Sequence, residues 1–128
     1  MTIGVCDDDK EYLEKEIALC RDCLPGDHSF YRFYDGRELL AVEEALDLVL
    51  LDIEMPNING IEVKEKLQML SEQTVIVFVT NHREFVMDAF DINVIGFVVK
   101  GMMEEQLPIV LDKAEKLLNR YTLIEEKN

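Results

Sequence analysis

Five short apolar segments alternate along the chain with longer segments whose apolar residues recur at helical spacing. The apolar segments, which predict strands, are residues 2–6, 29–34, 48–51, 75–79 and 94–99. The periodic segments predict helices at about residues 9–23, 37–44, 60–70, 84–90 and 104–121. Strands that alternate with helices are typical of α/β domains. We therefore predict a five-stranded parallel sheet that is doubly wound, with helices on both faces.

Polar residues end most of these strands. Right-handed crossovers place the carboxyl ends of parallel strands at one edge of a sheet, and ligands bind at that edge in open α/β folds. The residues at these ends are Asp7 and Asp8, Asp52, Thr80 and Lys100. The fold prediction therefore brings three carboxylates, a hydroxyl and an ammonium together from distant parts of the chain.

This set of side chains favours phosphoryl-transfer chemistry with a divalent cation. Two carboxylates at roughly 5 Å and an effective dielectric of about 20 repel by on the order of 3 kcal/mol. Mg²⁺ would offset that repulsion because it prefers oxygen ligands. A carboxylate beside Mg²⁺ can attack phosphorus, while the ion and a lysine share the charge on the transferring oxygens.

Composition narrows the function. The chain has 128 residues and a net charge of −14, which argues against direct nucleic-acid binding and against an anionic membrane surface. The chain start lacks a signal-peptide pattern, and no apolar run could span a bilayer. We expect a cytoplasmic domain with buried, reduced cysteines, although Cys20 and Cys23 form a CxxC that could instead serve redox or metal chemistry.

The order and spacing of the strand-end residues resemble the receiver domain of two-component response regulators. The resemblance covers essentially the whole chain and rests on Asp7-Asp8, residues 50–56 (LLDIEMP), Asn59-Gly60, Thr80 and Lys100. It implies a flavodoxin-like (βα)5 fold over residues 1–121, with residues 122–128 starting a linker or tail. Residues 78–82 and 89–97 are more specifically similar to receivers of LytTR-type transcriptional regulators. We therefore expect control of transcription through a LytTR-type DNA-binding domain that this chain lacks.

The resemblance also implies a role for individual residues. Asp52 would be the phosphoacceptor, and Lys100 would pair with the phosphoryl group or with the Asp52 carboxylate. Mg²⁺ would be held by Asp7, Asp8, Asp52 and the backbone carbonyl of Glu54, with Asp8 as a direct ligand and Asp7 acting through water.

Further positions would act in the conformational switch and in hydrolysis of the acyl phosphate. The resemblance implies that phosphorylation draws the Thr80 hydroxyl inward and that Phe97 follows. Glu54 and His82 occupy the two positions that tune hydrolysis of the acyl phosphate. The phosphoryl donor would be a sensor histidine kinase. The face made by residues 84–90, 94–99 and 104–121 would form a homodimer or contact an output domain.

The sequence departs from the family pattern at one position, and two alternative functions remain open. Gly101 follows Lys100 where the family usually has a cis-proline; because a non-proline cis bond costs about 3 kcal/mol, this peptide is either trans or strongly forced. A haloacid dehalogenase-type phosphohydrolase also uses an aspartate, Mg²⁺ and a lysine, but its Asp-x-Asp motif lies in the first strand of its core, whereas Glu54 stands two residues after Asp52 here. A degenerate receiver would bind partners without phosphorylation. A true receiver is not an enzyme beyond its own phosphorylation and dephosphorylation.

Overall fold

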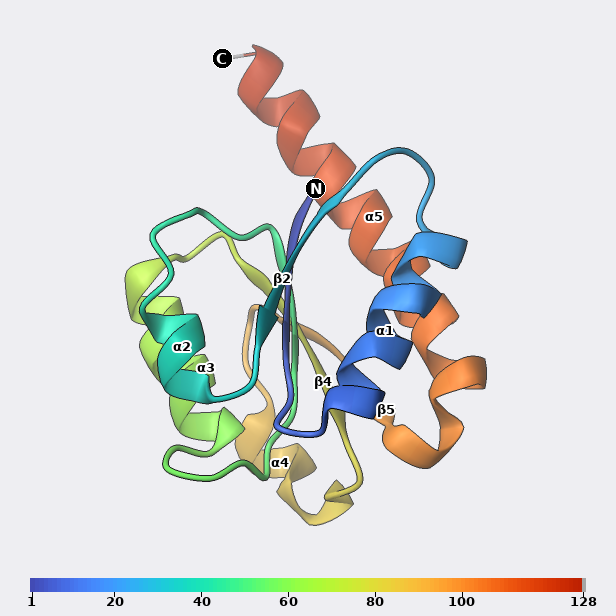
Figure 1. Ribbon diagram of the computed structural model, residues 1–128. Helices are drawn as coiled ribbons and strands as arrows, with labels where there is room; N and C mark the ends of the chain where they lie inside the picture. Colours follow the sequence, from blue (N-terminus) through green and yellow to red (C-terminus); the bar gives the residue numbers. More distant parts are fainter. Residues whose placement is uncertain (128) are drawn as a thin grey trace.

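The strands form one parallel sheet in the order β2-β1-β3-β4-β5 (Figure 1). The computed structural model describes residues 1–127, with side chains described to residue 120. The strands are β1 (Thr2–Cys6), β2 (Ser29–Phe33), β3 (Leu48–Leu51), β4 (Val75–Thr80) and β5 (Val94–Val99). Strands β1, β3 and β4 form the buried centre of the sheet, as their continuous apolar sequences predict. The predicted α/β fold is confirmed.

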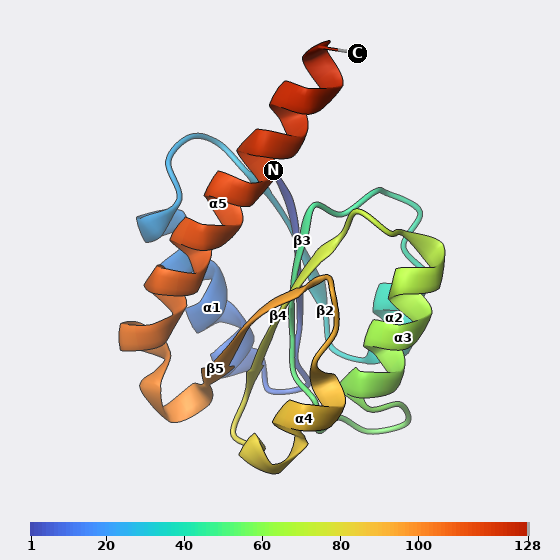
Figure 2. The same ribbon diagram turned by 180° about the vertical axis from the view of Figure 1, so that it is seen from behind.

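Helices cover both faces of this sheet (Figures 1 and 2). The helices are α1 (Lys10–Cys23), α2 (Gly36–Leu40), α3 (Gly60–Leu70), α4 (Val86–Ala89) and α5 (Met103–Lys127). Helices α1 and α5 pack against each other and bury one apolar cluster with the sheet. Helices α2, α3 and α4 lie over the opposite face, where a second cluster is buried. The doubly wound arrangement therefore has a core on each side of the sheet.

Some helix boundaries differ from the predicted ones. Helix α2 ends at Leu40 rather than near residue 44, and the Ala41 N–H closes its last turn by donating to the Arg37 and Glu38 carbonyls. The segment predicted as a helix at residues 84–90 is a 3₁₀ turn, Arg83–Phe85, followed by the single turn of α4. Helix α5 continues to Lys127, through the residues assigned to a linker or tail, so the domain boundary at residue 121 stays a prediction.

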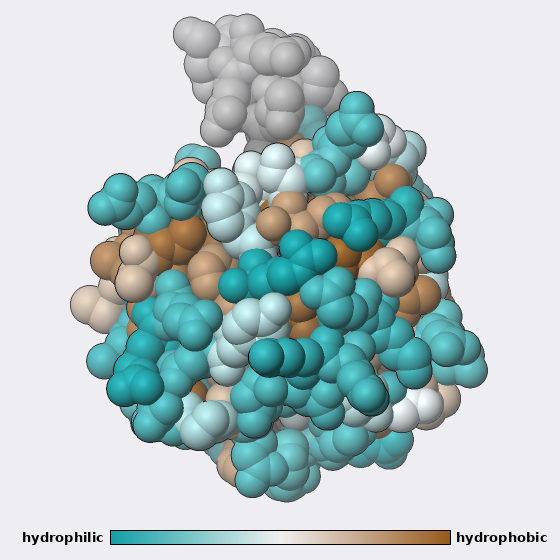
Figure 3. Space-filling model, in the orientation of Figure 1, coloured by the Kyte–Doolittle hydropathy of each residue, from teal (hydrophilic) through white to brown (hydrophobic). Residues whose placement is uncertain are grey.

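Polar residues dominate the surface around this core. On the face shown in Figure 3, hydrophilic residues cover most of the area, and apolar residues appear in smaller patches between them. Over the described part of the chain, no helix combines the length and the apolar character needed to cross a bilayer.

Candidate functional site

The turn after β1 fixes the first acidic residues of the site. The Asp7 N–H donates to the Phe33 carbonyl at 3.0 Å, and Asp7 Oδ1 accepts the Asp9 N–H at 2.9 Å. Asp9 is the N-cap of α1, because its side chain accepts two N–H groups of the first helical turn. Asp7 is fully buried, whereas Asp8 is exposed. The acidic pair thus presents one carboxylate inside the domain and one at its surface.

Asp52 lies at the end of β3, next to the turn after β1. Its N–H donates to the Cys6 carbonyl at 3.1 Å, and its Oδ1 accepts the Ile53 N–H at 2.7 Å. The following loop folds back, so that the Gly60 N–H donates to the Ile53 carbonyl at 2.7 Å. A Cβ on Gly60 would overlap the Asp52 carbonyl oxygen, and only glycine allows this close approach.

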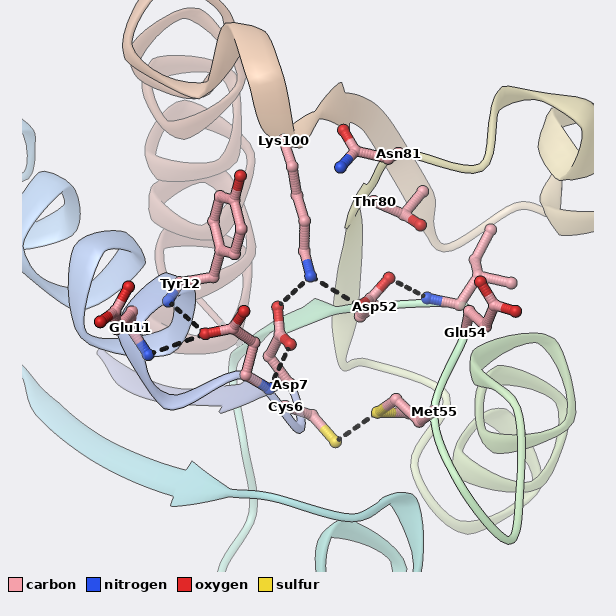
Figure 4. A network of polar contacts seen from close by, with 12 residues as sticks. Cys6, Asp7, Glu11, Tyr12, Asp52, Glu54, Met55, Thr80, Asn81 and Lys100 are labelled. Atoms are coloured by element: carbon pink, nitrogen blue, oxygen red, sulfur yellow. Dashed lines mark hydrogen bonds and ion pairs between the residues drawn. The ribbon is translucent and has the colours of Figure 1, made fainter.

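Lys100 joins the two buried carboxylates (Figure 4). Its Nζ lies 2.8 Å from Asp7 Oδ2 and 2.8 Å from Asp52 Oδ2, and its side chain is only 9% exposed. Burial alone would lower the pKa of Lys100, but the contacts with Asp52 and Asp7 outweigh burial and raise it above its ordinary value. Lys100 therefore stays charged between the two carboxylates.

The acidic set can accommodate a divalent cation. Asp7, Asp8 and Asp52 each offer a carboxylate oxygen, and these oxygens lie within 4.8 Å of one another. Asp7 Oδ2 is buried and accepts no hydrogen bond of good geometry, although it pairs with the charge of Lys100. Burial raises the pKa of Asp7, which the contact with Lys100 only partly opposes. A hard cation such as Mg²⁺ fits because it would give Asp7 Oδ2 the partner that it lacks and would add positive charge to that of Lys100.

Thr80 ends β4 and is also fully buried. Its Oγ1 accepts the His82 N–H at 3.2 Å, which turns the chain after the strand. Among the described residues, no hydrogen bond joins Thr80 to Asp52. The structure brings Asp7, Asp8, Asp52, Thr80 and Lys100 to one edge of the sheet, as predicted from the strand ends.

Comparison with known proteins identifies this arrangement. The family model described as "Response regulator receiver domain" matches residues 3–112. The chain belongs to this family. The match leaves the dehalogenase-type alternative without support, and the flavodoxin-like receiver fold is confirmed.

Curated relatives of this receiver domain include regulatory and sensory transduction proteins. It is 36% identical over 84 residues to the positive alginate biosynthesis regulatory protein of Pseudomonas aeruginosa, covering 64% of this chain and 34% of that protein. It is 29% identical over 110 residues to the sensory transduction protein LytT of Oceanobacillus iheyensis, covering 83% of this chain and 41% of that protein. The predicted similarity to LytTR-type receivers is confirmed, and the receiver spans about a third to two fifths of these relatives.

Solved structures show the same fold. The response regulatory domain of mrkE from Klebsiella pneumoniae superposes with a TM-score of 0.85 at 20% identity, covering 94% of this chain and 99% of that one. The response regulator TrrA of Thermotoga maritima, solved in complex with Mg²⁺-BeF, gives a TM-score of 0.70 at 26% identity, covering 88% and 97%.

The two positions expected to tune hydrolysis lie together beside the receiver site. His82 Nε2 contacts Glu54 Oε2, and His82 Nδ1 lies 3.1 Å from Glu84 Oε1. The sequence singled out Glu54 and His82 separately, whereas the structure joins them. The backbone role of Glu54 in metal binding stays a prediction.

Phe97 packs against the second apolar cluster. The Phe97 ring is partly buried in the cluster on the α3 face, with its centroid 5.9 Å from that of Phe78. Its role as a switch stays a prediction.

The Lys100–Gly101 peptide is trans, since residues 1–127 contain no cis bond, and the Gly101 N–H donates to Asn81 Oδ1 at 3.3 Å. Asn81 thus anchors the segment after Lys100, a contact that the sequence did not indicate.

The cysteines only partly match their prediction. Cys6 and Cys20 are buried free thiols, but Cys23 is exposed, so the expectation of three buried thiols is wrong for Cys23. The C-terminal turn of α1 places it on the outer side of the helix. Burial raises the pKa of Cys20 to about 12, with smaller effects of Glu16 and Cys23, which favours the neutral thiol over the thiolate.

Glu16 is a buried acid that the sequence pattern did not reveal. It lies on α1, is 1% exposed, and has an Oε2 without a hydrogen-bond partner. Burial, and then the nearby charge of Asp7, raise its pKa well above its ordinary value of 4.5. Folded Glu16 therefore keeps its proton at a pH where the unfolded chain has lost it.

We predict that Glu16→Leu stabilises the domain by about 1–2 kcal/mol at pH 8, because it removes a buried polar group that makes no hydrogen bond. The stability that the Glu16 proton confers is complete below pH 4.5 and is lost as pH rises toward the raised pKa. The difference in the free energy of unfolding between the variant and the wild type, which we call the gap, should therefore widen from pH 4.5 to 8 when measured by urea unfolding. Glu16→Gln, which keeps a polar group but cannot titrate, should give a gap that also grows with pH but is smaller. A gap that shrinks with rising pH would contradict the assignment.

Proposed function

We propose that this receiver domain accepts a phosphoryl group on Asp52 in an Mg²⁺-dependent reaction and thereby switches an output. The observation that carries the proposal is the placement of Lys100 Nζ, 2.8 Å from both Asp7 Oδ2 and Asp52 Oδ2, beside the exposed carboxylate of Asp8. This is a nucleophile with its charge partner already in place.

The proposal gives each side chain a task. An Asp52 oxygen attacks phosphorus, the new O–P bond forms, and the donor's leaving group departs with the electron pair of the old bond. Asp52 loses its carboxylate charge to the new bond, and the leaving group carries an equal negative charge away. The phosphoryl oxygens then present the negative charge that they brought, and Lys100 can reach them by a small displacement. Mg²⁺, when bound by Asp7, Asp8, Asp52 and the Glu54 carbonyl, supplies further positive charge for those oxygens. The Mg²⁺-BeF complex of the related TrrA supports this proposal.

The switch would follow from the arrival of the charged phosphoryl group on Asp52. The Thr80 hydroxyl, whose oxygen accepts the His82 N–H, would turn to a phosphoryl oxygen, and Phe97 would repack behind it. The surface that would change is formed by α4, β5 and α5, where Met87 and Phe90 are 84% and 75% exposed. We infer that this surface binds a second copy or an output domain of the LytTR type.

Family membership supports the remaining partners. The phosphoryl donor would be a sensor histidine kinase, and the domain, at residues 1–121, would act in the cytoplasm with residues 122–128 leading to a further segment. Its chemistry would be limited to its own phosphorylation and dephosphorylation. The intact acidic set argues against a degenerate receiver.

Incubation with acetyl phosphate and Mg²⁺ tests the proposal. We expect the intact mass to rise by one phosphoryl group, and we expect Asp52→Asn to abolish this increase because the amide is not a nucleophile of this kind. Asp47→Asn is a matched control, since Asp47 lies at the opposite end of β3 and accepts the Thr2 N–H at 2.7 Å. Modification that persists in the Asp52 variant, or that is unaffected by EDTA, would refute the proposal.

A further inference from the structure

The ammonium of Lys100 has a third neighbour besides the two carboxylates. Its Nζ lies 4.6 Å from the centroid of the Tyr12 ring, well within the distance at which an aromatic face attracts a cation. Of the three N–H donors of the ammonium, one is hydrogen-bonded to Asp52 Oδ2, and Asp7 Oδ2 lies 2.8 Å from Nζ as an ion-pair partner. Figure 4 shows the Tyr12 side chain beside Lys100, on the side of the site away from Glu54. The ammonium is thus enclosed by two acids and a neutral ring.

The first turn of α1 and the adjacent apolar cluster hold Tyr12 in position. Tyr12 lies in the first turn of α1, and its N–H donates to Asp9 Oδ1 at 3.3 Å. The ring also packs against the apolar cluster between α1, α5 and the sheet. Because Asp9 caps the helix and is bonded to Asp7, the ring and the acidic pair are held by one short segment.

A ring differs from a carboxylate as a partner for this ammonium. It attracts the cation without taking one of its hydrogen bonds, so Lys100 stays free to move its donors from Asp52 to an incoming phosphoryl oxygen. It also lets the site hold the lysine without adding a further negative charge beside three carboxylates. Without the ring, the flexible four-carbon stem of Lys100 would have an additional direction in which to move.

We propose that Tyr12 is a positioning residue that holds Lys100 in place for phosphoryl transfer to Asp52. This inference rests on the proposed function. In the reaction with acetyl phosphate, the Asp52 oxygen forms a bond to phosphorus and acetate leaves with the electron pair of the broken P–O bond. Tyr12 exchanges no proton and forms no bond. Its effect is on how often Lys100 occupies the position that stabilises the transferring oxygens.

Three variants separate the ring from its hydroxyl and from general packing. Tyr12→Phe keeps the ring, Tyr12→Leu removes it but leaves an apolar side chain, and Tyr34→Leu is the matched control. Tyr34 also has a lysine over its ring, with Lys10 Nζ at 5.3 Å from the centroid, but this pair does not involve the phosphorylation site. The rate of phosphorylation by acetyl phosphate with saturating Mg²⁺ is measured by intact mass. We expect Tyr12→Leu to be about tenfold slower, with Tyr12→Phe and Tyr34→Leu close to the wild type.

A spectroscopic measurement makes the test independent of turnover. The ring current of Tyr12 should shift the NMR signals of the Lys100 ε-methylene and ammonium protons upfield in the wild type and in Tyr12→Phe, and this shift should vanish in Tyr12→Leu. A wild-type rate in folded Tyr12→Leu, or an equal loss in Tyr12→Phe and Tyr12→Leu, would overturn the positioning role. A wild type that is not phosphorylated at all would instead overturn the proposed function.

Discussion

Replacing Lys100 with methionine should slow phosphorylation of Asp52 by about 100-fold, because it removes a fixed positive charge from the transferring oxygens. It should also lower the free energy of unfolding by about 3 kcal/mol in the absence of Mg²⁺. The reason is that Asp7 and Asp52 are buried, and Lys100 lies 2.8 Å from each of them. Mass spectrometry measures the first effect, and urea unfolding measures the second.

Lys116→Met is the control for the loss of a lysine ion pair. Lys116 Nζ lies 2.9 Å from Asp112 Oδ2 one turn earlier on α5, but its side chain is 70% exposed. Such surface pairs contribute about 0.3–0.5 kcal/mol, so this variant should unfold and become phosphorylated almost as the wild type does. Equal stability losses in the two variants would show that Lys100 does not compensate buried charge.

Mg²⁺ should reduce the stability difference between Lys100→Met and the wild type. In the variant, three carboxylates face one another without the lysine, so a bound cation relieves more repulsion than it does in the wild type. Urea unfolding of both proteins with and without Mg²⁺ measures this difference. A larger Mg²⁺ stabilisation of the wild type would mean that the cation and Lys100 do not act on the same carboxylates.

The strand-end residues could be predicted from the sequence because strand length and connection together determine their positions. Strands β1 and β3 end one residue before Asp7 and Asp52, and β4 ends at Thr80. Parallel pairing brings these ends to one edge of the sheet. Lys100 follows β5 directly. The main residues of the site could therefore be predicted from the periodicity of the strands and the right-handed crossover alone.

The side chains contributed by α1 could not be predicted in this way. Tyr12 contacts Lys100, and Glu16 is buried one turn further on. Their surroundings depend on how α1 is rotated about its axis and on how closely it packs against α5. A glutamate at such a position ordinarily indicates the solvent side of a helix, because buried carboxyl groups are costly.

The region after Thr80 was only partly predictable. Apolar residues at helical spacing indicated a helix, but no side chain caps the turn at His82, and the chain forms a 3₁₀ turn before the short α4. The contact of His82 with Glu54 follows from the pairing of β3 with β4, which brings the segments after these two strands together. Sequence spacing alone indicates no such contact between side chains from separate loops.

Gly60→Ala should destabilise the domain by about 3 kcal/mol, with a fall in Tm on the order of 10 °C. A Cβ at this position would overlap the Asp52 carbonyl oxygen and lie 2.8 Å from Ile53 Cα. Backbone atoms at the end of a buried strand cannot move aside as a flexible side chain could, so the strain must displace either α3 or the loop after Asp52. Thermal unfolding monitored by circular dichroism measures the loss.

Gly101→Ala provides the matched control, because a Cβ on Gly101 would meet no atom within 4 Å and the residue does not have a positive φ. That variant should keep the wild-type Tm within about 2 °C, as expected for an open surface position. Because the strain at residue 60 falls on the residue that bears the nucleophile, Gly60→Ala should also slow phosphorylation at temperatures where the variant remains folded. A wild-type Tm in Gly60→Ala would mean that α3 can shift away from Asp52 at little cost, and the close approach would then not be what fixes the Asp52 backbone.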